Sequence, residues 1–187
     1  MTDQRRREHV IETFPELEEI RGDEIRRKTI DAWALAMAEN GVEDLTGVPW
    51  LPPDQQRLDL GDVWLVDHVR EVAAGGLALA ELLNERRDAG IETDIVVAGG
   101  LLHDVSKLYE FEGFERTEIG TLLGHPYYGV YVAGSVDLPP DLVAITVNHT
   151  SVTNVEPATI EAAIVSQADY ASAAAIWGAG GRDLRNV

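Results

Sequence analysis

Apolar residues recur at helical intervals along most of this chain, and no stretch alternates with period two for long enough to suggest a sheet. The pattern predicts a short helix over residues 3–14, which Pro15 interrupts. A second helix is expected over residues 16–39 and should end at Asn40-Gly41. Further helices are expected at residues 62–88, 93–102, 121–135, 140–149 and 157–176. The sequence therefore predicts an all-α fold.

Proline, glycine and acidic residues mark the boundaries between these predicted helices. Residues 42–61 contain three prolines and two glycines, and we expect a loop or short turns there. Asp62 is expected to cap the long helix that follows, and Gly90 to end it. Residues 110–120, which include the text FEGFERTEIG, are expected to form an irregular excursion from the helical pattern.

Composition narrows the class of protein. The chain has 187 residues, 45% of them apolar, which suits one domain with one sizeable core. No stretch approaches the roughly 18 continuous apolar residues of a membrane span, and the N-terminal MTDQRRREHVIETF lacks the apolar segment of a secretory signal. The absence of cysteine excludes disulfides, thiolate metal sites and cysteine nucleophiles. We expect a soluble, cytoplasmic protein with no membrane partner.

The formal net charge of −18 argues against a nucleic-acid partner, because a phosphate backbone requires patches of lysine and arginine. Only two lysines occur, Lys28 and Lys107. An anionic substrate would therefore need a local source of positive charge, and a bound metal ion is the obvious candidate. Arg116 is expected at the surface, paired with Glu115 or Glu118.

Four of the five histidines lie in the predicted core helices or at their ends. They are His68, His103, His125 and His149, whereas His9 lies in a polar segment and is expected to be an ordinary surface residue. Asp169 falls in the strongly apolar text IVSQADYASAAA, where an ionised carboxylate needs a partner. Each residue alone has an ordinary explanation, such as a helix cap or an ion pair. The functional hypothesis depends on the whole set.

Imidazole and carboxylate groups together suit Fe or Mn, and they also accept Zn, Co and Ni. The spacings are too long for a local chelate, so several helices must face a common centre. His103 and Asp104 are adjacent and point about 100° apart on a helix. They can therefore hold one ion between them, or Asp104 can reach a second ion on its other side.

The order His68, then His103-Asp104, then Asp169 resembles the H…HD…D signature of the HD superfamily, and the texts DHVREVA, LLHDVSK and ADYASA resemble its motifs. The resemblance covers roughly residues 60–175. It implies a helical bundle with a metal site between core helices, in a single domain over residues 1–187 on which N-terminal helices at 3–40 pack. The chain departs from the HD-GYP cyclic-dinucleotide phosphodiesterases, because SVTNVEPATI follows His149 in place of a Gly-Tyr-Pro run.

The resemblance also implies a ligand set and one or two divalent metal ions. His68, His103, Asp104 and Asp169 would be the primary ligands. His125, in GHPYYG, and His149, in NHT, match the two further histidines of the binuclear branches, with Asp104 as the bridge.

The activity implied is metal-dependent hydrolysis of a phosphoester or phosphoanhydride in a small phosphorylated substrate or nucleotide. Asp104 and Lys107 are the candidate catalytic residues. Asp104 would position the ions and orient the attacking water, and Lys107, three residues later on nearly the same helix face, would offset phosphate charge.

Two other functions stay open from the sequence. Di-iron oxygenases with an HD-like fold cleave C–C or C–P bonds with O₂ and use a similar set of ligands. A non-catalytic module that binds metal or nucleotide is the third hypothesis. A homo-oligomer is also left open, since the apolar stripe of Trp33, Leu35 and Met37 fits either a core or an interface.

Overall fold

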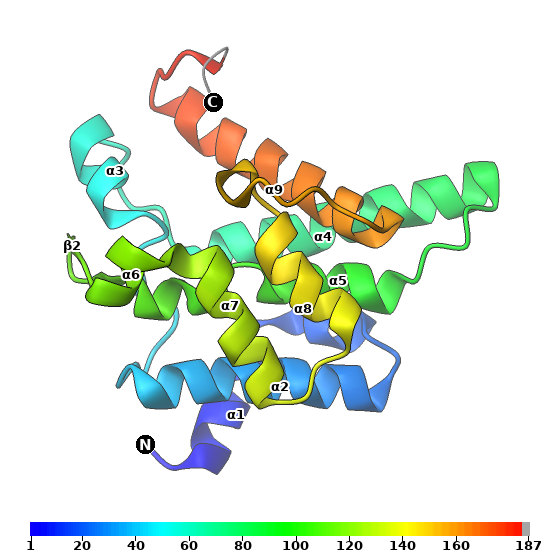
Figure 1. The fold of residues 1–187 in the computed structure, drawn as a ribbon, viewed down its shortest axis with the longest axis horizontal. Coiled ribbons are helices and arrows are strands. Elements are labelled where there is room, and N and C mark those ends of the chain that lie inside the picture. The colour runs from blue at the N-terminus through cyan, green and yellow to red at the C-terminus, as the bar shows by residue number, and fades with distance from the viewer. Residues whose placement is uncertain (185–187) are drawn as a thin grey trace.

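The computed structural model describes residues 1–184 and is almost entirely helical, which confirms the predicted all-α class (Figure 1). Residues 185–187, which the predicted domain includes, lie outside the described residues. Within the described part, the only strands are the antiparallel pair β1 (Phe111–Glu112) and β2 (Glu115–Arg116). The α-helices are α1 (Asp3–Thr13), α2 (Asp23–Glu39), α3 (Pro52–Leu58), α4 (Leu65–Arg87), α5 (Thr93–Leu102), α6 (Glu118–Leu122), α7 (Gly124–Ser135), α8 (Pro140–Asn148) and α9 (Ile160–Ala179). Three short 3-10 helices join them: η1 (Pro15–Glu19), η2 (Val105–Tyr109) and η3 (Ser151–Thr153).

Helix α5 forms the centre of the fold. Every residue from Ile95 to Leu102 is buried, so the helix has no polar face to offer to solvent. A helix that is apolar all round must be covered on every side. Helices α2, α4, α8 and α9 all contact it, and Figure 1 shows it enclosed between α4 and α2.

The N-terminal helices pack against this centre through α2. Trp33 is fully buried, and its indole Nε1 donates a hydrogen bond to the carbonyl oxygen of Leu101 at 2.9 Å. The Phe14 ring lies 5.0 Å from the Trp33 ring, and Met37 is also fully buried. Trp33 and Met37 of the apolar stripe therefore belong to the core of this chain.

Two boundaries predicted near the N-terminus are wrong. The expected helix over 16–39 is interrupted, because the Asp94 carboxylate accepts hydrogen bonds from the backbone N–H groups of Arg21, at 3.1 Å, and Gly22, at 2.7 Å. These bonds hold the chain extended between η1 and α2. The expected loop over 42–61 contains helix α3, since proline is compatible with a first helical turn and Pro52 and Pro53 begin it.

The caps of later helices also differ from the prediction. Asp62 does not cap α4, because the backbone of Leu65 bonds to the carbonyl oxygen of Val48 at 2.8 Å and keeps the preceding residues extended. The expected excursion at 110–120 is a small hairpin that turns at Gly113, where φ is +61°, followed by α6. Helix α9 begins at Ile160, after the N-cap Thr159 whose hydroxyl accepts from the N–H of Ala162, and not at Pro157.

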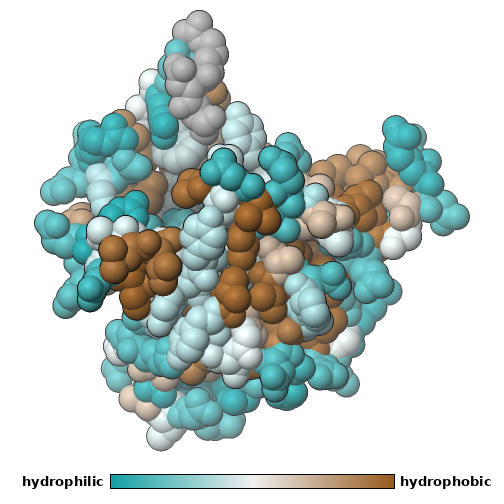
Figure 2. All heavy atoms as spheres, in the orientation of Figure 1, coloured by the Kyte–Doolittle hydropathy of each residue, from teal (hydrophilic) through white to brown (hydrophobic). Residues whose placement is uncertain are grey.

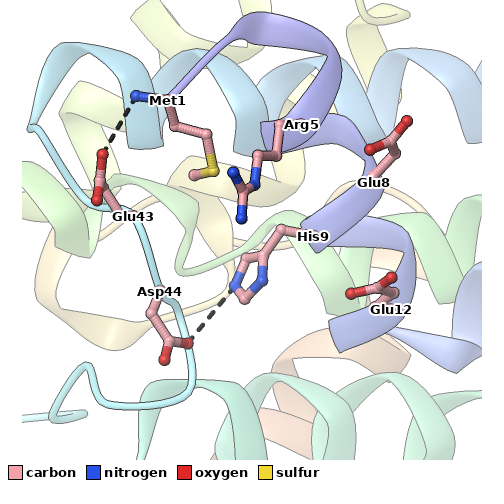
Figure 3. A pocket seen from close by; sticks show the side chains of 7 residues that line it. All are labelled: Met1, Arg5, Glu8, His9, Glu12, Glu43 and Asp44. Carbon is pink, nitrogen blue, oxygen red and sulfur yellow. Dashed lines mark hydrogen bonds and ion pairs between the residues drawn. The ribbon is translucent and has the colours of Figure 1, made fainter.

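His9, the histidine outside the predicted ligand set, lines a hollow near the N-terminus (Figure 3). His9 Nε2 accepts a hydrogen bond from the backbone N–H of Leu45 at 3.0 Å and lies 3.6 Å from an Asp44 oxygen. The amino group of Met1 bonds to Glu43 at 3.1 Å in the same hollow. His9 thus joins the first helix to the loop after α2. Among the described helices, none has the length and apolar character needed to cross a bilayer.

Glycines let α5 approach its neighbours closely. A Cβ added at Gly100 would lie 2.6 Å from the Cα of Ala73 on α4, and one at Gly99 would lie 2.8 Å from Ile145 on α8. Both distances are shorter than van der Waals contact. The glycine pair therefore sets how near α4 and α8 come to the segment that ends in His103-Asp104.

We predict opposite effects of the same substitution at two helical glycines. Gly100→Ala should destabilise the fold by about 1–3 kcal/mol, because its methyl group meets the backbone of α4. Gly75→Ala should stabilise it by about 0.5–1 kcal/mol, because Gly75 lies inside α4 with nothing within 4 Å of its added Cβ. Urea denaturation of both variants measures the difference. A neutral Gly100→Ala variant would contradict the close approach of α4 and α5.

Candidate metal centre

The six predicted ligands come from five helices and meet at one end of α5. His68 lies on α4, and His103 and Asp104 directly follow the last residue of α5. His125 lies on α7, His149 directly follows α8, and Asp169 lies on α9. Their side chains form two groups of three, whose ligand atoms lie within 4.8 Å of one another: His68, His103 and Asp169 in the first cluster, and Asp104, His125 and His149 in the second cluster.

The first cluster joins two imidazoles to one carboxylate. The Nε2 atoms of His68 and His103 lie 3.2 Å apart. An oxygen of Asp169 lies 3.1 Å from His68 Nε2 and 3.7 Å from His103 Nε2. Both histidines are buried, and Asp169 is partly exposed towards the adjoining cavity.

Asp104 connects the two clusters through its two oxygens. Oδ1 lies 3.1 Å from His125 Nε2 and 3.7 Å from His149 Nε2, in the second cluster. Oδ2 lies 3.5 Å from His68 Nε2 and 3.6 Å from His103 Nε2, in the first cluster. The indole Nε1 of Trp50 donates to Oδ2 at 3.2 Å. One buried carboxylate thus faces both groups of imidazoles.

Hydrogen bonds behind the rings fix the tautomer of all four histidines. The Nδ1 atoms of His103 and His149 lie 2.7 and 3.2 Å from the carbonyl oxygens of Gly100 and Ile145, which can only accept. Each Nδ1 therefore carries the proton, and each Nε2 has a free lone pair.

In His68 and His125, a side chain and not a backbone carbonyl accepts the hydrogen bond from Nδ1. The Ser172 hydroxyl donates to Glu71 at 2.6 Å, so it accepts from His68 Nδ1 at 2.9 Å. The Glu110 carboxylate accepts from His125 Nδ1 at 2.8 Å. All four Nε2 atoms thus point inward, where each can offer a lone pair to a cation once it carries no proton.

Burial keeps two of these imidazoles neutral. It lowers the pKa of His149 to about 3 and also lowers the pKa of His103, because a charged ring loses its hydration there. Burial and Lys107 act to lower the pKa of His125 as well, but the carboxylates of Asp104 and Glu110 outweigh them and raise it. Neutral imidazole is the form that binds metals.

The carboxylates stay ionised despite their burial. Burial alone would raise the pKa of Asp104, but the ammonium of Lys107, together with the His125 imidazole, holds it well below its usual range. Burial would likewise raise the pKa of Asp169, but the neighbouring His68 imidazole outweighs burial and lowers it. Anionic carboxylates therefore lie beside the neutral imidazoles of His103 and His149, and oxygen and nitrogen donors of this kind match those of divalent metals.

Lys107 lies beside this centre and not in it. Its Nζ is 3.8 Å from Asp104 Oδ2 and 3.9 Å from Glu110 Oε2, and its side chain is almost wholly buried. The ammonium also lies 5.6 Å from the centroid of the Trp50 ring. The predicted proximity of Lys107 and Asp104 is present, although η2 and not an α-helix positions the lysine.

Glu110 is a site residue that the sequence analysis missed. It is buried, accepts a hydrogen bond from His125 Nδ1 and forms an ion pair with Arg116. The predicted pairing of Arg116 with Glu115 or Glu118 is therefore wrong. Burial opposes its ionisation, but the bond from His125 and the nearby cations bring its pKa to about 2. Nothing in its local sequence distinguishes it from a surface acid.

Trp50 and Ser172 were also missed. Ser172 carried a usable signal, since it follows Asp169 by three residues and so shares its helix face. Trp50 carried a weaker one, as a large aromatic residue in a loop rich in proline and glycine.

A cavity of about 440 Å³ opens onto the centre, a size in the range of roughly 300–1,000 Å³ usual for small-molecule sites. Asp104, Lys107, His125, His149 and Asp169 all line it.

The helical fold and the paired clusters define a class: an all-α protein with histidine–aspartate groups of the kind that hold divalent metals. The family model for the HD domain matches residues 65–174, which is more than half of the chain. The chain belongs to the HD-domain family. This confirms the resemblance inferred from the motif order.

A curated relative is the protein named dihydroneopterin 2',3'-cyclic phosphate phosphodiesterase from Methanocaldococcus jannaschii. It is 28% identical to this chain over 171 residues, which cover 82% of this chain and 65% of the relative. The chain thus spans somewhat less than two thirds of that relative's length. No solved structure gives a significant match.

We predict that Glu110→Gln weakens metal binding at the second cluster by about 10–100-fold, because a neutral amide no longer holds the His125 ring through a charged hydrogen bond. Elemental analysis after dialysis against dilute chelator should find less metal per chain than in the wild type. Glu112→Gln, an equivalent change at an exposed acid two residues further along the chain, serves as the control. Equal metal content in all three proteins would contradict a role for Glu110.

Proposed function

We propose that this chain is a metal-dependent phosphohydrolase that cleaves a phosphoester of a small molecule. The observation that carries the proposal is the placement of Asp104, whose two oxygens face different clusters, at 3.1 Å from His125 and 3.5 Å from His68. Two-metal hydrolytic sites hold their ions about 3.5–4 Å apart, and a shared carboxylate suits that spacing. Membership of the HD-domain family supports the same chemistry.

The donor set fits one or two divalent ions. The first cluster offers two imidazole nitrogens and an Asp169 oxygen, and the second offers two imidazole nitrogens and an Asp104 oxygen. Such mixed nitrogen and oxygen donors favour Fe or Mn and also accept Zn, Co and Ni. Bound ions of this kind lower the pKa of a coordinated water towards ~7 and offset charge on a phosphoryl oxygen.

The chain's own residues orient and neutralise the substrate. The hydrogen bond from Trp50 orients the Asp104 carboxylate between the two clusters. Asp104 would thereby fix the position of the water that attacks the substrate. Lys107 directs its ammonium to the same cavity and offsets charge that develops on the phosphoryl oxygens. Its burial strengthens that electrostatic effect, because less water screens it.

The substrate class is supported by the name of the relative, which acts on a cyclic phosphodiester. We therefore propose a phosphodiester, and a five-membered cyclic phosphate is the first substrate to assay. The chain's charge of −18 makes local cations necessary for such an anion, and Lys107 and Arg116 both line the cavity.

Asp104→Ala is predicted to lose bound metal at both clusters and to abolish hydrolysis, because Asp104 is the carboxylate that, among residues 1–184, lies beside histidines of both clusters. Metal content by elemental analysis and phosphate-ester hydrolysis should fall together. Asp141→Ala, at an exposed acid in the first turn of α8, should retain both. Full activity in a metal-free Asp104→Ala variant would refute the proposed centre.

Lys107→Met is predicted to keep its metal and to lower kcat by about 10²–10³-fold, since it removes one cation from the developing charge. Lys28→Met is the matched control at the chain's other lysine, which bonds to the carbonyl oxygen of Asp137. Both assays are run without oxygen, because hydrolysis proceeds there whereas an O₂-dependent cleavage stops. Unchanged kcat in Lys107→Met would exclude its assigned role.

A further inference from the structure

The mouth of the metal-site cavity is apolar and exposed. Val152 and Leu122 are 74% and 73% exposed, the highest values among the large apolar side chains of residues 1–184, and Leu123 is 52% exposed. These three residues, which we call the apolar rim, line the same cavity as His125 and Asp169. Figure 2 shows apolar side chains gathered over α6, the helix that ends at Leu122.

Among residues 1–184, no segment covers the apolar rim and shields it from solvent. Single exposed apolar residues are common on protein surfaces, but a group that surrounds one cavity usually marks a binding site. Leu122 and Leu123 come from the end of α6, and Val152 comes from η3, so separate segments bring them to the same opening.

Aromatic rings extend this apolar surface into the cavity. Trp50 precedes α3, Trp177 lies on α9, and both line the cavity with their ring centroids 5.7 Å apart. Aromatic rings contact one another in offset-stacked or edge-to-face arrangements, which add to the gain from burying their area. A planar ligand group therefore suits the part of the cavity between the rim and the metal ligands.

The charged and polar residues of the cavity lie at its inner end, away from the apolar rim. Asp104, Lys107 and His149 are all buried there, whereas the rim is open to solvent. A ligand that matches this gradient has an anionic group at one end and an uncharged apolar group at the other.

We propose that the apolar rim binds an uncharged planar ring on the alcohol portion of the substrate, while the phosphate lies against the metal ligands and Lys107. This inference rests on the proposed phosphohydrolase function and adds the class of alcohol that the enzyme accepts. It makes Leu122, Leu123 and Val152 determinants of specificity, with no part in bond cleavage.

The size of the rim favours a substrate over a second copy of the chain. Stable protein interfaces use about 20–30 residues from each partner. The rim has three residues. Two acidic residues lie near it: exposed Glu118 is on α6, four residues before Leu122, and partly exposed Asp54 lines the same cavity.

Two phosphonates that differ only in their apolar group test the proposal. Calorimetric titration of the metal-loaded full chain with phenylphosphonate and methylphosphonate compares a ring with a methyl group on the same anionic head. We expect phenylphosphonate to bind on the order of tenfold more tightly, a preference typical of apolar pockets. Equal affinity for the two ligands, or binding of neither, would overturn the proposal.

A double variant, Leu122→Ser with Val152→Ser, should remove the preference and leave methylphosphonate affinity unchanged. Both side chains are exposed, so the fold does not depend on them. Leu82→Ser is the matched control, at a leucine on α4 that is 48% exposed and does not line the cavity. Loss of the preference in the control, or its survival in the double variant, would contradict the assignment.

Two further measurements separate the possible failures. Light scattering reports whether the double variant changes molecular mass, and a change would identify the rim as an interface between copies and overturn the substrate assignment. Metal content and hydrolysis of a cyclic phosphate by the wild type test the proposed function independently. If the wild type binds metal and hydrolyses the cyclic phosphate but shows no preference for phenylphosphonate, the rim proposal fails and the proposed function stands.

Discussion

The convergence of four imidazole lone pairs is the constraint on which the rest of this structure depends. His68 and His103 bring their Nε2 atoms to 3.2 Å, although each ring's proton is committed at Nδ1. Two lone pairs at that distance repel each other unless a cation lies between them. The Asp104 carboxylate beside them adds negative charge to the same volume. The fold therefore concentrates electron-donating atoms where only a positive charge makes the arrangement favourable.

The scaffold concentrates its least polar segment directly behind this charged volume. Helix α5 is buried from Ile95 to Leu102 and then ends at His103 and Asp104. Glycines at 99 and 100 allow α4 and α8 to pack tightly on it, so the helices that carry His68 and precede His149 are held at short range. Close packing in this region limits side-chain motion, which keeps ligand positions within the tolerance that a metal centre needs.

The sequence predicts the chemistry of the centre better than its surroundings. The order of His68, His103-Asp104 and Asp169, and the position of the two later histidines, predicted six residues that do come together. Glu110, Trp50 and Ser172 could not be assigned in the same way, because their roles depend on which ring or oxygen they meet across the fold. Local propensity also failed where a long-range bond decided the backbone, as when Asp94 interrupts the helix expected over 16–39.

The distribution of the ligands along the chain has a consequence for its biogenesis. His68 and Asp169 meet in one cluster, yet helices α5 to α8 separate them in sequence. No fragment that stops short of α9 contains the complete first cluster, so a growing polypeptide cannot capture an ion with all three of its ligands until α9 has emerged and docked. An ion bound at this cluster would therefore enter late, and the folded chain, not the nascent one, would select among the available metals.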